Sequence, residues 1–395
     1  MTRTPYIAAC MSKIQTMADK EIIFLDNAST TLVDEEVIET FNKVKKQYFA
    51  NPSSIHLLGQ EADRLLLKAR TQILHLFNIE SSHELIFTSG ATEGNNLAIK
   101  GYCLYNKNRG KHIITSNIEH PSVLEIFYQL RDYFGFDITV LPVNEAGIIE
   151  VKQLKDAIKK ETILVSLMAV NNEIGSINPI QEIAALLKDY PLIAFHVDAT
   201  QAIGKIDLPY QDIDMFTFSG HKIHGLNSSG CLLKRKNINL LPLFSGGGQE
   251  NNYRSGTSDV ALFASLAKAL RLSLSRKEQL YEHAKRLSSL LVDYLLKHPD
   301  LYVLNSKENV HIVNFSLLNK KASVVVEALS NAGIMVSSVS ACHAKEEPIS
   351  YVVQAIKHNE LLAHNTIRVS VDLSNNENDI KHFISSLEKI VEEVK

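Results

Sequence analysis

A lysine set between two histidines follows an apolar stretch in the sequence Phe216-Thr217-Phe218-Ser219-Gly220-His221-Lys222-Ile223-His224-Gly225. A lysine at the mouth of a buried strand is partly desolvated, which lowers its pKa from the usual value of about 10.4. The neutral amine forms a Schiff base with an aldehyde, and pyridoxal phosphate (PLP) is the commonest aldehyde held by proteins. Taken alone, however, the stretch is more typical of a surface lysine after a strand.

Two other polar stretches also follow apolar ones. The small residues of Thr88-Ser89-Gly90-Ala91-Thr92-Glu93-Gly94 open a helix, whose free N–H groups and dipole favour a phosphate. His120 starts another helix, and a flat imidazole suits both stacking on a pyridine ring and proton transfer. Each of these features is also explained by an ordinary helix cap.

Asp198 directly follows the apolar stretch Ala194-Phe195-His196-Val197. A buried carboxylate is costly without a cationic partner. A protonated pyridine nitrogen is such a partner, and pairing with it makes the ring an electron sink. The spacing from Asp198 to Lys222 fits the ends of two neighbouring strands. Between His120 and Asp198, the stretch Val170-Asn171-Asn172-Glu173-Ile174-Gly175 offers amide donors and acceptors. The phosphate turn, the histidine, these amides, Asp198 and Lys222 together predict a PLP site.

Strands and helices alternate over residues 84–234, which predicts an α/β fold with a mostly parallel sheet. Seven strands are expected at Leu85–Thr88, His112–Thr115, Ile138–Leu141, Ile163–Met168, Ile193–Val197, Met215–Ser219 and Gly230–Lys234. Helices are expected at Asp34–Tyr48, Ser54–Leu76, Thr92–Tyr105, Pro121–Phe134, Val151–Lys159 and Glu182–Asp189. In such sheets ligands bind at the carboxyl ends of the strands, where the residues above lie.

The pattern changes after residue 258. A long helical tract, Asp259–Lys297, with a possible break, precedes a mixed tail with strands at Val310–Phe315 and Thr366–Val371 and helices at Ser323–Asn331 and Glu377–Val394. We therefore expect a large domain over residues 32–262 and a smaller α+β domain formed by residues 21–31 and 263–395. Residues 1–20 are expected to be a disordered or mis-started tail.

Composition excludes several classes of protein. The 395 residues carry 41 basic and 44 acidic side chains, without a basic stripe for nucleic acid, and no apolar run is long enough for a membrane span. The four cysteines, Cys10, Cys103, Cys231 and Cys342, are widely spaced, which favours a reducing compartment and hence the cytoplasm. His221 and His224 lack a third ligand, so no metal site is expected.

The chain resembles the cysteine desulfurases of the class V aminotransferase group, which have fold type I of the PLP enzymes. The resemblance runs from Leu25-Asp26-Asn27-Ala28 to Arg368. It rests on Asn51-Pro52-Ser53-Ser54-x-His56, Thr88–Glu93, Glu119-His120, Val170-Asn171-Asn172-Glu173-Ile174-Gly175, Val197-Asp198-Ala199-Thr200-Gln201, Ser219–Lys222 and Arg254-Ser255-Gly256-Thr257.

The resemblance implies a role for each matching residue. Lys222 would bind PLP covalently and shuttle protons, and His120 would stack on the ring as an acid/base. The remaining cofactor contacts would come from Ala91, Thr92, Asn172, Asp198, Gln201, Ser219 and His221, with Thr257 supplied by the other subunit of a homodimer. Arg368, together with Asn172, would bind the substrate carboxylate, for which a planar guanidinium is suited.

The resemblance also implies a sulfur-transfer step. Cys342, in Ser338-Val339-Ser340-Ala341-Cys342-His343, would take sulfur from L-cysteine as a persulfide, leave L-alanine, and pass the sulfur to a protein acceptor in iron–sulfur cluster assembly or tRNA thiolation. Val339, Leu226–Ser229 and Asn251-Asn252 depart from the usual family residues, and Pro348 is displaced. These departures favour a specialised desulfurase as much as a general one.

Two alternatives remain open at this point. A related PLP lyase or aminotransferase, such as a selenocysteine lyase, would share the same PLP residues. A non-catalytic scaffold that binds a sulfur acceptor is the alternative from a different class, and it would be colourless.

Overall fold

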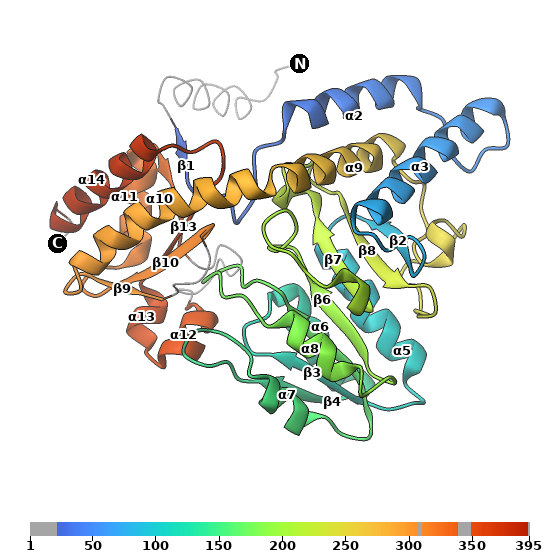
Figure 1. Ribbon diagram of the computed structural model, residues 1–395, viewed down its shortest axis with the longest axis horizontal. Coiled ribbons are helices and arrows are strands. Elements are labelled where there is room, and N and C mark those ends of the chain that lie inside the picture. Colours follow the sequence, from blue (N-terminus) through green and yellow to red (C-terminus); the bar gives the residue numbers. More distant parts are fainter. Residues whose placement is uncertain (1–21, 306–309, 339–348, 394–395) are drawn as a thin grey trace, which may run out of the picture.

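A computed structural model describes residues 22–305, 310–338 and 349–393 (Figure 1). The seven predicted strands are all present, as β2 (His83–Thr88), β3 (His112–Ser116), β4 (Asp137–Leu141), β5 (Thr162–Met168), β6 (Ala194–Asp198), β7 (Met215–Ser219) and β8 (Gly230–Arg235). They form one sheet in the order β2-β8-β7-β6-β5-β3-β4, in which only the pairings of β8 are antiparallel. The α/β fold with a mostly parallel sheet is therefore confirmed.

The central strands β5, β6 and β7 are buried along their whole length, because helices cover both faces of the sheet. The helices of this part are α2 (Glu35–Gln47), α3 (Leu57–Leu76), α4 (Ala91–Asn95), α5 (Tyr102–Asn106), α6 (Pro121–Phe134), α7 (Val151–Ala157), α8 (Ile180–Leu187) and α9 (Val260–Ser275). A π-helical stretch, η1 (Asn96–Gly101), joins α4 to α5, so the helix predicted over 92–105 is one continuous run. Short 3-10 turns lie at η2 (Tyr210–Asp212), η3 (Gly220–Lys222) and η4 (Glu250–Asn252).

The second part of the chain is built on a small antiparallel sheet in the order β12-β13-β10-β9. Its strands are β9 (Tyr302–Leu304), β10 (Ile312–Leu317), β12 (Ser337–Ser338) and β13 (Thr366–Ser370), and its helices are α10 (Lys277–Lys297), α11 (Ala322–Asn331), α12 (Tyr351–Lys357), α13 (Glu360–His364) and α14 (Glu377–Glu393). The short strands β1 (Ile23–Phe24) and β11 (Ile334–Met335) pair in parallel as a separate two-stranded sheet, and a bridge from Asp26 to Ser370 joins the N-terminal segment to β13.

The predicted long helix is broken at Arg276, and its two halves run end to end across the molecule (Figure 1). Apolar residues of α9, among them Phe263 and Leu270, pack into the core of the large sheet. Those of α10, among them Leu287 and Leu291, pack with Leu25 into a separate core. We therefore propose a domain boundary at Arg276 in place of the one expected after residue 262, with residues 22–31 in the smaller domain.

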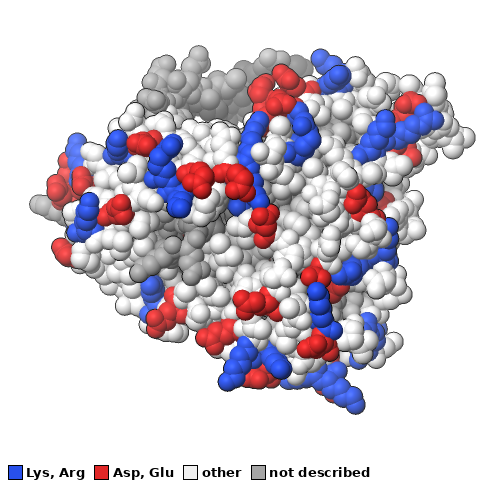
Figure 2. Space-filling model, viewed as in Figure 1, with Lys and Arg blue, Asp and Glu red and all other residues white. Residues whose placement is uncertain are grey.

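Charged side chains of both signs are interspersed over the face drawn in Figure 2, without a broad area of one sign. A helix long and apolar enough to cross a membrane does not occur in the described ranges.

Candidate active site

The parallel strands bring residues from distant parts of the chain to one edge of the large sheet. Asp198, the last residue of β6, lies between Met168 of β5 and Thr217 of β7 in the strand register. Strand β5 ends at Met168 and β7 ends at Ser219, and the chain then continues to Asn172 and Lys222 respectively. The carboxyl ends of these strands therefore gather the asparagine, the aspartate and the lysine, as the spacing predicts.

Lys222 ends the 3-10 turn η3, directly after β7. Its Nζ donates hydrogen bonds to the main-chain oxygens of Ala28 and Ser29, at 2.6 Å each. Burial, and next the positive charges of Arg368 and Lys205, lower the pKa of the Lys222 amine to about 7. A large fraction of this amine is therefore neutral, and nucleophilic, near neutral pH.

Asp198 is almost completely buried, with 6% of its surface exposed. Its carboxylate accepts hydrogen bonds from Asn95 Nδ2 at 2.9 Å and from the main-chain N–H of Thr200 at 3.0 Å. Within the described ranges no lysine, arginine or histidine forms an ion pair with it. A buried carboxylate held only by neutral donors is suited to a cationic ligand group.

The turn between β2 and α4 forms a close-packed cradle at the same edge. Gly90 has a φ of 150°, and a Cβ at this position would lie 3.2 Å from Ser219 Oγ. The same oxygen accepts a hydrogen bond from the main-chain N–H of Ala91 at 2.7 Å, at the start of α4. Thr92 is exposed beside it. The Ser219 and Thr92 hydroxyls add side-chain hydrogen-bonding groups to the free N–H groups at this helix start.

Two of the predicted site residues are histidines, His120 and His221. His120 is the N-cap of α6, where its Nδ1 accepts from the main-chain N–H of Ser122 at 3.0 Å. Burial lowers the pKa of His120, and the Lys222 charge adds to the effect. His221 lies 3.3 Å through Nδ1 from Thr30 Oγ1, and burial lowers the pKa of its imidazole to about 4. Both rings are therefore neutral at physiological pH.

Arg368 in β13 reaches the site from the smaller sheet. Its Nη2 donates to Asp26 Oδ1 at 2.7 Å and to Ser29 Oγ at 2.6 Å, and its Nη1 donates to the main-chain oxygen of Asn172 at 2.7 Å. The Nε of Arg368 and the side-chain Oδ1 of Asn172 are buried without a hydrogen-bond partner in the described part of the chain. The guanidinium is thus held in place with a donor left over for a ligand.

Gln201 is joined to the lysine through a shared acceptor. Its Nε2 donates to Ala28 O at 2.8 Å, the oxygen that also accepts from Lys222. Its Oε1 accepts from Lys205 Nζ at 3.1 Å. The amide orientation is fixed by these two contacts, since a carbonyl oxygen only accepts and an ammonium only donates.

Not every expected site residue joins this cluster. Thr257 is exposed, and within the described ranges no hydrogen bond joins it to the residues above. Cys342, His343, Val339 and Pro348 lie outside the described residues. Asn252, one of the departures from the family pattern, has a φ of 67°, a left-handed conformation that asparagine tolerates better than most residues.

The sequence reasoning missed three residues at the site: Asp26, Ser29 and Asn95. Asp26 closely follows the short strand β1, so the rule that ligands bind at strand ends could have indicated it. Asn95 lies inside a predicted helix, and nothing in the helical pattern distinguishes it from a structural asparagine.

The arrangement fits PLP on the grounds of its own polar atoms. Asp198 lacks a cationic partner, while Asn172 Oδ1, Thr200 Oγ1 and Arg368 Nε are buried and unpaired within the described ranges. Unpaired buried polar atoms are rare in folded proteins unless a ligand or water satisfies them. A carboxylate for a ring nitrogen, a lysine with a lowered pKa and a hydroxyl-lined turn match the parts of this cofactor.

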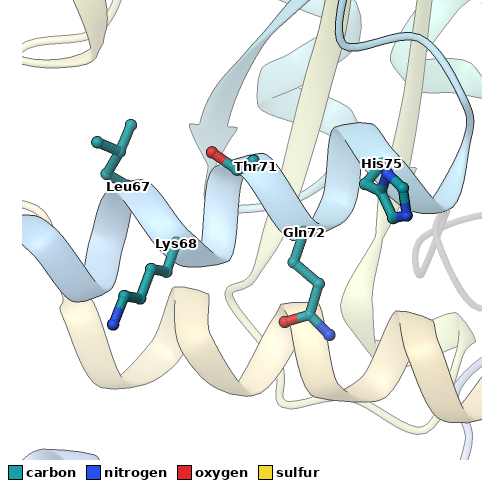
Figure 3. A pocket seen from close by; sticks show the side chains of 5 residues that line it. All are labelled: Leu67, Lys68, Thr71, Gln72 and His75. Atoms are coloured by element: carbon teal, nitrogen blue, oxygen red, sulfur yellow. The ribbon is translucent and has the colours of Figure 1, made fainter.

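Other features of the molecule do not compete with this site. A surface hollow on one flank of α3 is lined by Leu67, Lys68, Thr71, Gln72 and His75 (Figure 3), none of which belongs to the cluster. Among the described residues no group of three or more histidine, cysteine, aspartate or glutamate side chains is placed to hold a metal ion.

Comparison with known proteins gives concordant matches along nearly the whole chain. Residues 23–383 match the family model of class-V aminotransferases. The chain is 39% identical to a NifS/IcsS protein homolog of Lactobacillus delbrueckii subsp. bulgaricus over 93% of this chain and 97% of that protein. It is 38% identical to the cysteine desulfurase IscS of Dictyoglomus turgidum, over 95% and 96% of the two chains. A solved NifS-like protein superposes with a TM-score of 0.87 at 31% identity, covering 94% of this chain and all of the other.

Proposed function

The chain belongs to the class V aminotransferase family, and we propose that it is a PLP-dependent cysteine desulfurase that converts L-cysteine to L-alanine. Its similarity to proteins named cysteine desulfurase, at 38% identity over most of the chain, supports this reaction rather than transamination. The observation that carries the proposal is the lysine at the sheet edge. Lys222 is held beside a buried aspartate without an ionic partner and has a pKa lowered to about 7.

The residues that would hold PLP are those gathered at the sheet edge. Lys222 would bond to it covalently, Asp198 would face its ring nitrogen and His120 would stack on its ring. The ring oxygen would be bound by Asn172 and Gln201, and the phosphate by Ala91, Thr92, Ser219 and His221. When bound, the cofactor supplies an electron sink that stabilises negative charge at the substrate carbons.

The substrate carboxylate would bind Arg368. Its unpaired Nε is available for one oxygen, and Asp26 and Ser29 keep the guanidinium plane in a fixed orientation. Lys222 Nζ, neutral in a large fraction near pH 7, would take the proton from the substrate Cα. His120 would donate from Nε2, because its Nδ1 already accepts a main-chain hydrogen bond.

Cys342 would carry the sulfur. The substrate carbon–sulfur bond breaks as the Cys342 Sγ bonds to that sulfur, so the enzyme gains a persulfide while the β-carbon takes a proton and leaves as alanine. The two cysteines of the described residues, Cys103 and Cys231, are poor candidates, since complete burial raises the pKa of both thiols well above the usual value. The persulfide would pass to a protein acceptor in iron–sulfur cluster assembly or tRNA thiolation. Since free-thiol chemistry requires a reducing compartment, we place the enzyme in the cytoplasm.

We also propose a homodimer in which Thr257 completes the phosphate site of the partner. Thr257 is exposed, and in the described ranges no hydrogen bond joins it to the cluster of its own chain. The segment around the start of α3 exposes several large apolar side chains, with Ile55 92%, Phe49 73%, Leu57 68% and Leu58 50% exposed. Such a concentration of exposed apolar groups is expected at an interface with another chain.

One assay tests the proposal. The purified chain should show the visible absorbance of bound PLP and should form alanine and a protein-bound persulfide in equal amounts from L-cysteine. A chain that is colourless is a scaffold, and one that forms alanine from selenocysteine but not from cysteine is a selenocysteine lyase. Either result would contradict the proposal.

A further inference from the structure

The side-chain amide of Asn95 is completely buried at the end of α4 and makes three hydrogen bonds. Its Nδ2 donates to Asp198 Oδ2 at 2.9 Å and to Ser122 Oγ at 3.1 Å. Its Oδ1 accepts from Thr217 Oγ1. Since a carboxylate only accepts, the nitrogen must face Asp198, and the orientation of the amide follows.

A chain of hydrogen bonds leads from Asn95 through Ser122 to His120. Ser122 Oγ, which accepts from Asn95, lies 2.8 Å from His120 Nδ1 and so has its own proton free to donate to that nitrogen. The main-chain N–H of Ser122 donates to the same nitrogen at 3.0 Å. An imidazole nitrogen that accepts carries no proton, and the neutral ring therefore has its proton on Nε2.

We propose that Asn95 is a positioning residue that fixes the Asp198 carboxylate and, by orienting the Ser122 hydroxyl toward His120 Nδ1, reinforces the Nε2–H tautomer of His120. Asp198 ends β6 and His120 lies at the N-terminus of α6. Asn95 is hydrogen-bonded to Asp198 directly and to His120 through Ser122. One buried amide thus couples Asp198, which would face the ring nitrogen of PLP, through Ser122 to His120, which would stack on the ring. This role rests on the proposed function, since it assigns Asn95 to the same PLP site.

The backbone of α4 approaches β7 closely enough for this network only because residue 94 is glycine. A Cβ on Gly94 would lie 2.9 Å from Thr217 Cγ2, inside any normal contact distance. The Thr217 hydroxyl is in turn what holds the Asn95 oxygen. The Gly94-Asn95 pair and Thr217 therefore form one packing unit.

The charged and titratable groups that face His120 act in opposite directions. Burial is the largest effect and lowers its pKa; Asp198 from β6 raises it, and Lys222 after β7 lowers it. Glu119, next to it in the chain, is buried, and its pKa is raised to about 8. Glu119 is therefore mostly neutral at pH 7, and the tautomer of His120 is decided by the two hydrogen bonds from Ser122 to its Nδ1.

The test uses the holoenzyme. Asn95→Leu removes all three hydrogen bonds at nearly constant volume, and we expect PLP to dissociate at least about tenfold faster with a shifted visible absorbance. Asn106→Leu is the matched control, because Asn106 is also buried and bonded, but to Tyr102 O and Arg109, away from the site. A purely structural role would lower the melting temperature of both variants and leave the absorbance and retention of the cofactor unchanged.

Ser122→Ala tests the histidine branch alone. It removes one of the two donors to His120 Nδ1, so protonation of that nitrogen becomes easier. In a plot of kcat against pH, the fall on the acid side should then occur about half a pH unit to one pH unit higher. The cofactor absorbance should be unaltered. An unmoved fall on the acid side, or a change in the absorbance, would overturn the proposed chain of bonds.

Thr217 provides a milder pair of variants in case Asn95→Leu does not fold. Thr217→Val removes the hydroxyl that orients the amide, and about threefold faster cofactor loss is expected, whereas Thr217→Ser keeps it and should behave as the unsubstituted chain. Equal retention in the two variants would refute the role of Asn95. A colourless unsubstituted chain would instead refute the proposed function, so the two failures are distinct.

Discussion

The guanidinium of Arg368 and the carboxylate of Asp26 form an ion pair of 2.7 Å between side chains that are 8% and 19% exposed. The pair joins β13 of the smaller sheet to the segment after β1. Because Asp26 already neutralises part of the charge, the arginine is held at the site without the full cost of an isolated buried cation. Its Nε, which has no hydrogen-bond partner in the described residues, would bind the substrate carboxylate in the proposed reaction.

Arg368→Lys tests this arrangement. A lysine keeps the charge but loses the planar fork, so the KM for L-cysteine should rise about tenfold or more while kcat changes less. Steady-state kinetics measure both quantities. Arg271→Lys, the same change at an exposed position of α9, should leave KM unchanged. A KM for Arg368→Lys within twofold of the original value would refute carboxylate binding by Arg368.

The lowered pKa of Lys222 predicts a pH dependence for the uptake of added PLP by the cofactor-free chain. The protonated amine is inactive, so the uptake rate should rise about tenfold per pH unit below pH 7 and level off above the pKa of about 7. Stopped-flow absorbance follows the reaction. A rate that keeps rising up to pH 10 would show an amine with an ordinary pKa.

Cys342→Ser should abolish persulfide formation and leave the PLP absorbance intact, since the cysteine acts on sulfur after the cofactor is bound. Mass spectrometry of the intact chain after reaction with L-cysteine detects the added sulfur. Cys10→Ser is the control and should still form the persulfide. If the sulfur appears on Cys103 or Cys231 instead, burial has not suppressed their reactivity and the assignment is wrong.

Glu119 gives stability a specific pH dependence. Burial raises the pKa of its carboxyl to about 8, so between its usual value and pH 8 the folded chain holds a proton that the unfolded chain has released. Stability contributed by this group therefore falls as the pH rises through that range. The melting temperature should drop less between pH 5 and 8 in Glu119→Gln than in the unsubstituted chain. Glu125→Gln, exposed on α6, should behave as the unsubstituted chain, and parallel curves for all three would contradict the raised pKa.

The proposed dimer is tested at its most exposed apolar residue. Ile55→Asp places a charge on a side chain that is 92% exposed in the single chain, so a change in monomer stability is not expected. If this surface meets a partner, the dimer should dissociate at least about tenfold more readily in sedimentation experiments, and PLP should be retained less well. Tyr133→Asp, at an exposed position of α6, is the control. A stable dimer with Ile55→Asp would place the interface elsewhere.

The sequence determined the large sheet and the order of its chemical groups. Apolar runs such as Thr162–Met168 and Met215–Ser219 bury both of their faces only when helices cover both sides of the sheet. Asp198 and Lys222 come at the ends of such runs. The break between α9 and α10 was also foreseen, although not the division of cores at Arg276. The local sequence pattern is enough to predict these strands, because whether a strand is buried depends on the hydrophobicity of its own residues.

Only the tertiary structure decided which side chains meet across distant segments. Asp26 reaches Arg368, and Ala28 accepts from both Lys222 and Gln201, because β1 pairs with β11 and carries the N-terminal segment over the sheet edge. Asn95 looks like any helical asparagine until α4 packs against β7 through Gly94. Hydrogen bonds between residues more than a hundred positions apart depend on packing geometry, which no local pattern of hydrophobicity encodes.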